Sequence, residues 1–81
     1  FVEAMENYVA IYLEGKKIIT HTTIKSLLEK LPAKQFIQTH KSYVVGISKV
    51  NTIEGNTLHV QDYQVPVSKY LREEVLGKIV K

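Results

Sequence analysis

Short apolar segments separated by polar turn residues run through most of the chain and limit it to a fold built largely from strands. Residues 8–13 are rich in β-branched and aromatic side chains, which favour strands. A polar break at residues 14–17 contains Gly15, and residues 18–22 read as the returning strand of a hairpin. Similar patterns predict further strands at residues 36–39, 43–47, 50–54, 57–60 and 63–67.

Turn residues in the second half of the chain indicate how some of these strands are connected. The Gly55-Asn56 dipeptide predicts a second hairpin between residues 50–54 and 57–60. Pro66 has no N–H to donate, so the segment that contains it should be an edge strand. The strand patterns also carry aromatic residues that we expect in the core, namely Tyr12, Phe36, Tyr43 and Tyr63.

Two segments show helical spacing instead. A short amphipathic helix is predicted after Thr22-Thr23, where a threonine can supply the N-cap oxygen, and Pro32 should end it. Ser68 is placed to cap a C-terminal helix. The buried faces would hold Ile24, Leu27, Leu28 and Leu31 in the first helix and Leu71, Val75, Leu76 and Ile79 in the second. The sequence therefore predicts a mainly β fold of small antiparallel sheets, six or seven strands in all, with one short internal helix and a C-terminal helix.

The length of 81 residues fits one domain, residues 1–81. The chain has no initiator methionine and opens on apolar residues, so we expect it to be part of a longer protein. Cysteine is absent, which excludes disulfides and thiolate metal sites. No apolar run approaches the roughly 20 residues that a membrane helix needs.

Catalytic and metal-binding patterns are missing from the sequence. Three histidines, His21, His40 and His59, lie far apart and show no metal-ligand spacing. The four glycines are isolated, so there is no glycine-rich phosphate loop, and Asp62 is the only aspartate. We expect neither an enzyme nor a cofactor.

Positive charge gathers in the middle of the chain. The net charge is +3, and residues 30–53 hold four lysines and one histidine but no acidic residue. This distribution indicates a basic face that would attract phosphate groups. A solvated lysine surface is the alternative. Neither helical segment has the pattern of a recognition helix, and the internal one has few long polar residues opposite its apolar face, which argues against a helix-turn-helix protein.

Several ordered blocks of the sequence resemble the LytTR family of DNA-binding domains. The central block consists of Leu31-Pro32, Phe36, His40-Lys41-Ser42-Tyr43-Val44-Val45, Val50 and Ile53. The flanking blocks are Glu3 with Asn7-Tyr8-Val9, the hairpin before the leucine-rich helix, and Val65-Pro66-Val67-Ser68-Lys69. Together they cover nearly the whole chain.

The resemblance implies that loops, rather than an inserted helix, contact double-stranded DNA. Three regions would face the duplex: Asn7-Tyr8, His40-Lys41-Ser42 and Ser68-Lys69-Tyr70. Family members bind paired repeats as dimers and bend the DNA. They usually form the output half of cytoplasmic response regulators, behind a receiver domain that a sensor histidine kinase controls.

Each candidate has a structural alternative. His40 would contact DNA or hold its loop by bonding a backbone carbonyl, and Ser42 would bind a phosphate or cap the turn. Asn7 would contact DNA or serve as a turn former, and Tyr8 would pack inward or reach a phosphate.

Basic candidates lie further along the chain. Lys41 and Lys69 stand where the family often has arginine, so they should favour phosphates or single hydrogen bonds to bases. We expect Lys69 at the start of the last helix, an end that favours anions. Arg72 would contact the DNA backbone or pair with Glu73 or Glu74. Gly46 replaces a common asparagine and has no assigned role. The competing hypothesis is a β-rich protein-interaction module with a basic face.

Overall fold

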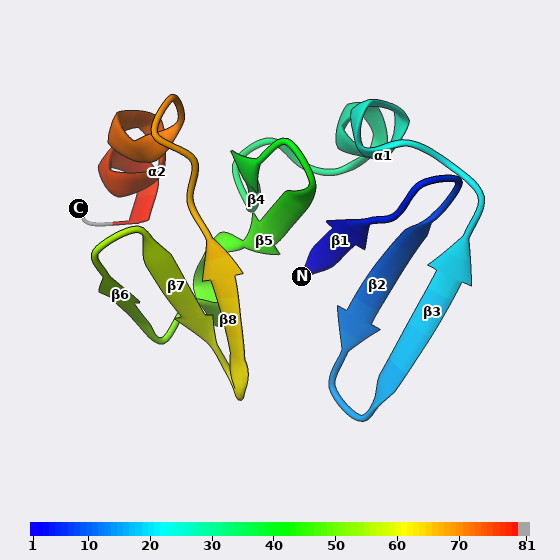
Figure 1. The fold of residues 1–81 in the computed structure, drawn as a ribbon, viewed down its shortest axis with the longest axis horizontal. Coiled ribbons are helices and arrows are strands. Elements are labelled where there is room, and N and C mark those ends of the chain that lie inside the picture. The colour runs from blue at the N-terminus through cyan, green and yellow to red at the C-terminus, as the bar shows by residue number, and fades with distance from the viewer. Residues whose placement is uncertain (80–81) are drawn as a thin grey trace.

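The structure, a computed structural model, describes residues 1–79 and contains two antiparallel sheets and two α-helices in this range (Figure 1). The five-stranded sheet has the order β3-β2-β1-β5-β4 and the second sheet the order β6-β7-β8. The first sheet comprises β1 (Val2–Ala4), β2 (Val9–Leu13), β3 (Lys16–Thr20), β4 (Phe36–His40) and β5 (Tyr43–Gly46). The remaining elements are α1 (Ile24–Lys30), a 3₁₀ helix (Ile47–Lys49), β6 (Thr52–Glu54), β7 (Thr57–Val60), β8 (Tyr63–Pro66) and α2 (Arg72–Ile79).

The mainly β prediction is confirmed, but the strand count is eight in the described range and not six or seven. The strand missed from the sequence is β1, which lies at the centre of the larger sheet. Val2 pairs with Ile11 of β2 on one side and with Val44 of β5 on the other. A strand of three residues gives too short a pattern to recognise, and its two neighbours are far apart in the chain.

The predicted hairpins form, with shifted boundaries. The turn between β2 and β3 consists of Glu14 and Gly15 alone, so β3 begins at Lys16 and ends at Thr20, two residues earlier at each end than predicted. Gly15 has a φ of +77°, which glycine adopts at no steric cost. In the second sheet, β8 carries Pro66 at an edge, as predicted.

The two helices differ in how well their ends were predicted. At α1, the Thr23 hydroxyl oxygen accepts a 3.1 Å hydrogen bond from the Ser26 N–H, and the chain leaves the helix at Leu31. The second helix begins only at Arg72, so the prediction that Ser68 caps it is wrong. Instead, Ser68 starts a turn in which its carbonyl accepts from the Leu71 N–H at 3.2 Å.

The core has two parts. One lies among β4, β5, the second sheet and α2, and the other packs α1 against β1, β2 and β5. Their buried residues are Ile37, Val45, Leu58, Val60, Val65, Val67 and Val75 in the first part and Val2, Val9, Ile24 and Val44 in the second. The prediction that Tyr63 is a core residue is wrong, since its side chain is 44% exposed. Tyr12, Phe36 and Tyr43 are half-buried.

Membrane crossing by a helix has no support in the described range. None of its helices is both long and apolar enough to span a bilayer.

Candidate nucleic-acid interface

Three turns come together along one edge of the molecule, the upper part of the view in Figure 1. They are the β1–β2 turn (residues 5–8), the β4–β5 turn (residues 41–42) and the β8–α2 turn (residues 67–71). We call this region the three-turn edge. The Ala4 N–H donates to the Ser42 carbonyl at 2.7 Å, and the Ser68 N–H donates to the Thr39 carbonyl at 2.8 Å. Backbone hydrogen bonds therefore join the end of β1, where the first turn begins, to the central turn, and join the third turn to β4, close to where the central turn begins.

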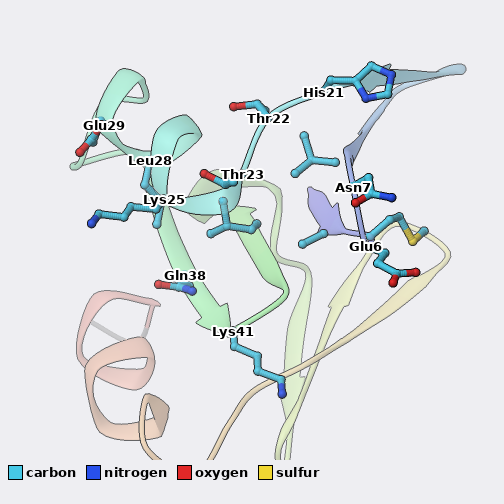
Figure 2. Close-up of a pocket in the computed structure, with 14 residues that line it drawn as sticks. Glu6, Asn7, His21, Thr22, Thr23, Lys25, Leu28, Glu29, Gln38 and Lys41 are labelled. Atoms are coloured by element: carbon cyan, nitrogen blue, oxygen red, sulfur yellow. The ribbon is translucent and has the colours of Figure 1, made fainter.

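Asn7 and Lys41, from two of these turns, line the same open hollow of about 910 Å³. Figure 2 shows Lys41 leaving the end of β4, with Asn7 on the β1–β2 turn and Lys25 on α1. Gln38 lies in the same hollow. Lys25 and Lys41 are both exposed, and the hollow sets these two lysines and its amide groups beside the carboxylates of Glu6 and Glu29. The amide groups can form hydrogen bonds to a ligand and the lysines can meet an anionic group, but the two carboxylates balance that charge, so the hollow by itself does not select an anion.

His40 holds the central turn in shape. It is the last residue of β4, where the pairing with β5 shifts by a bulge, and its Nδ1 accepts a 3.2 Å hydrogen bond from the Ser42 N–H. The ring therefore bonds a backbone N–H, and not the backbone carbonyl of the structural alternative. With Nδ1 as acceptor, a neutral imidazole carries its proton on Nε2 and can donate from there. The ring also packs edge-on against Tyr43, with centroids 5.7 Å apart.

The β1–β2 turn contains two adjacent candidate residues, one exposed and one packed. Asn7 is exposed, while Tyr8 is half-buried and lies edge-on to His21 at 6.4 Å between ring centroids. The Tyr8 carbonyl accepts from the Met5 N–H at 2.7 Å and closes the turn. Asn7 is thus the residue of the pair that a ligand can reach.

The β8–α2 turn presents two exposed residues. Tyr70 is 97% exposed, and Lys69 beside it is also exposed. The prediction that Lys69 lies at the start of the last helix is wrong, because α2 begins three residues later. Its charge is therefore carried by a turn and not by a helix end.

Arg72 is engaged elsewhere in the fold. Its guanidinium donates to the Gly55 carbonyl at 3.3 Å and also to the Asn56 side-chain oxygen. These bonds tie the start of α2 to the β6–β7 turn. The predicted pairing with Glu73 or Glu74 is not what the structure has.

The basic segment at residues 30–53 does not form one continuous face. Lys41 lies on the three-turn edge, whereas Lys49 lines a different cavity between the two sheets. Two residues from outside that segment, Lys25 and His21, line the hollow together with Lys41. Sequence reasoning missed these two residues and Gln38, because nothing in a linear pattern links a helix, a strand and a distant turn.

Comparison with known proteins gives one consistent result. A family model described as the LytTr DNA-binding domain matches residues 1–79. The sensory transduction protein LytT of Enterococcus faecalis is 34% identical over 85 residues, which cover 94% of this chain and 35% of that protein. The transcriptional regulatory protein YpdB of Escherichia coli K12 is 29% identical over 76 residues, covering 85% of this chain and 31% of that protein. The chain thus spans about a third of these relatives' length.

A solved structure shares the fold. The LytTr DNA-binding domain of a putative methyl-accepting/DNA response regulator from Bacillus cereus superposes with a TM-score of 0.86 at 20% identity. The match covers 99% of this chain and 79% of that one.

Proposed function

Because the chain belongs to the LytTR family of DNA-binding domains, we propose that its three-turn edge binds double-stranded DNA in a sequence-specific way. The observation that carries the proposal is the pair of backbone hydrogen bonds, Ala4–Ser42 and Ser68–Thr39, that bring the three turns close together. They support a shared edge for Asn7, Lys41 and Lys69 and reduce the freedom that separate loops would lose on binding.

The side chains of this edge divide by chemistry. Lys41 and Lys69 are point charges suited to phosphates, and they position the duplex. The Asn7 amide both donates and accepts, which is the pattern that reads adenine in the major groove. His40 offers an Nε2–H donor from a ring already fixed through Nδ1. Tyr70 adds an exposed ring and hydroxyl beside Lys69.

Other candidates have supporting roles in this proposal. Tyr8 is half-buried with its ring edge-on to His21, and Ser42 supplies the carbonyl that bonds Ala4 and the N–H that bonds His40. Arg72 fixes α2 to the β6–β7 turn and reaches DNA only by giving up those bonds. Neither helix enters a groove: α1 is seven residues long and packs on the core through Ile24.

In the complete protein, we propose that this domain is the output unit of a cytoplasmic response regulator that controls transcription. The family, and the names of the relatives with which the chain shares its sequence, support that assignment. A receiver domain controlled by a sensor histidine kinase would then set its activity. Two copies would bind paired repeats as a dimer, and tethering them would raise affinity through effective concentration. The domain itself is non-enzymatic and needs no cofactor.

Selection from random duplexes tests specific DNA binding against a protein-interaction role of the basic face. We expect enrichment of one short motif, which the paired arrangement would repeat. If the edge neutralises about four to six phosphates, log affinity should fall with log salt at a slope near −4 to −5. An interaction module for acidic proteins would also respond to salt but would enrich no motif, and that result would refute specific DNA binding.

A further inference from the structure

A second cavity lies between the two sheets, away from the three-turn edge. It has a volume of about 340 Å³, and four aromatic side chains line it, those of Phe1, Tyr12, Phe36 and Tyr63. Leu13 and Val60 add aliphatic surface. This size and this mostly apolar lining are typical of small-molecule sites in proteins. None of the residues in the proposed DNA interface lines it.

The aromatic walls hold a defined arrangement. Phe1 stacks on Tyr12 with centroids 4.5 Å apart, and Tyr63 meets Phe1 edge-on at 5.0 Å. The Tyr12 hydroxyl donates to the Glu3 carboxylate at 3.2 Å, which fixes the far end of that ring. Tyr63 nevertheless keeps 44% of its surface exposed. A rigid aromatic wall with exposed ring surface favours stacking by a planar ring.

Glycine at position 46 keeps the cavity open. Gly46 lines it and has φ −78° and ψ 124°, an ordinary extended conformation that any residue adopts. A Cβ added there would lie 3.5 Å from Phe36 Cε1 and 3.6 Å from Lys49 Cγ, which is normal van der Waals contact. The backbone therefore does not require glycine. A larger side chain at this position would occupy space that the cavity now offers.

We propose that this cavity binds a small planar aromatic carboxylate. The ring would stack against the aromatic lining, and Lys49 would receive the carboxylate. Lys49 lines the cavity and forms no ion pair within residues 1–79. Glu14 is the one acidic residue of the lining and belongs to the β2–β3 turn, so the anionic group should face the Lys49 side. Gln35, Ser48 and Gln61 offer further polar groups.

Titration of the ¹⁵N-labelled chain with 2-naphthoate, followed by ¹H–¹⁵N spectra, tests the site. Saturable shifts are expected at the amides of Gly46, Ser48 and Gln61, with a Kd of about 10 μM to 1 mM. Gly46→Leu should weaken binding about tenfold or more, since the leucine side chain would take up space inside the cavity that Gly46 lines. Gly77→Leu is the matched control, because Gly77 lies on α2 with open space around it. It should leave the Kd unchanged.

The charge assignment has its own comparison. Lys49→Gln should weaken 2-naphthoate several-fold but leave the uncharged 2-naphthalenemethanol unaffected. Gly46→Ala, whose added Cβ makes only ordinary contacts, covers the case in which Gly46→Leu fails to fold, and it should weaken binding to a lesser degree. Absence of saturable shifts, shifts confined to the three-turn edge, or equal affinity in the folded Gly46 variants would overturn the proposal.

Discussion

Tyr43 donates a 2.7 Å hydrogen bond from its hydroxyl to the carboxylate of Glu3, its cross-strand partner in the pairing of β5 with β1. The other carboxylate oxygen accepts from the Tyr12 hydroxyl on β2 at 3.2 Å. One side chain of the central strand thus links both neighbouring strands. Because β1 has only three residues, these two side-chain hydrogen bonds help to hold it between β2 and β5.

Replacing Tyr43 by phenylalanine should therefore destabilise the fold. Hydrogen bonds to charged groups contribute about 1.5–3 kcal/mol, and partial exposure of this one places the expected loss near the lower end. Urea unfolding of Tyr43→Phe measures it. Tyr8→Phe removes a hydroxyl for which the structure has no side-chain hydrogen bond within residues 1–79, so it serves as the matched control. Equal stability of the two variants would contradict the role of the Glu3 bond.

Alkaline pH should weaken the same contact. The hydrogen bond to Glu3, then burial and the nearby negative charge, raise the pKa of Tyr43 above its usual value. The unfolded chain releases this proton near pH 10, while the folded chain still holds it. The contribution of this hydrogen bond to the free energy of unfolding should therefore be fully present below about pH 10. It should be lost as the pH rises from there through the pKa of Tyr43 in the folded chain. Absorbance at 295 nm should show a late phase of tyrosine ionisation that Tyr43→Phe removes.

Thr39 is fully buried, and its hydroxyl oxygen has no hydrogen-bond partner among residues 1–79. An unsatisfied buried hydroxyl costs about 1–3 kcal/mol. Thr39→Val keeps the shape and removes that group, so we expect a gain in unfolding free energy of up to about 1 kcal/mol, visible as a higher Tm. A lower Tm would mean that the hydroxyl is satisfied in solution.

Removing the Nδ1 acceptor of His40 should loosen the central turn. In His40→Phe the ring can still pack on Tyr43, but the Ser42 N–H loses its partner. Faster hydrogen exchange is expected at the Ser42 amide, while the buried amide of Val44 should change little. Unchanged exchange at Ser42 would show that the turn holds without the histidine.

Lys41→Ala should weaken specific DNA binding by about 1–3 kcal/mol and leave the fold intact. Lys16→Ala is the charge-matched control, since Lys16 is exposed and directly follows the β2–β3 turn, which lies in the lower part of the view in Figure 1, away from the three-turn edge. Gel-shift titrations at one salt concentration, with circular dichroism of each variant, measure both effects. Equal losses for the two lysines would indicate nonspecific attraction, and a lower Tm with unchanged affinity would assign Lys41 to stability.

Local patterns in the sequence were sufficient for most of the secondary structure. Thr23 and Pro32 bound α1 because an N-cap oxygen and a missing N–H act within a few residues. The Gly55-Asn56 turn and the edge position of Pro66 follow from equally local chemistry. The prediction for Ser68 was wrong because it also used local chemistry alone. Serine can cap a helix, but here its N–H bonds the Thr39 carbonyl of β4, a contact between residues distant in the chain.

Neighbouring residues alone set the mainly β character of the domain and its short helix, because alternation, capping and turn preference act over a few residues. The three candidate contact regions came instead from the resemblance to the LytTR family. The tertiary structure puts β1 at the centre of the sheet and brings Asn7 and Lys41 to one hollow with Lys25, which no local pattern indicates. It also places Lys49, which belongs to the basic segment at residues 30–53, at a cavity beside Gly46. These outcomes depend on pairing between segments distant in the chain, and such pairing is decided by how all the apolar faces pack together.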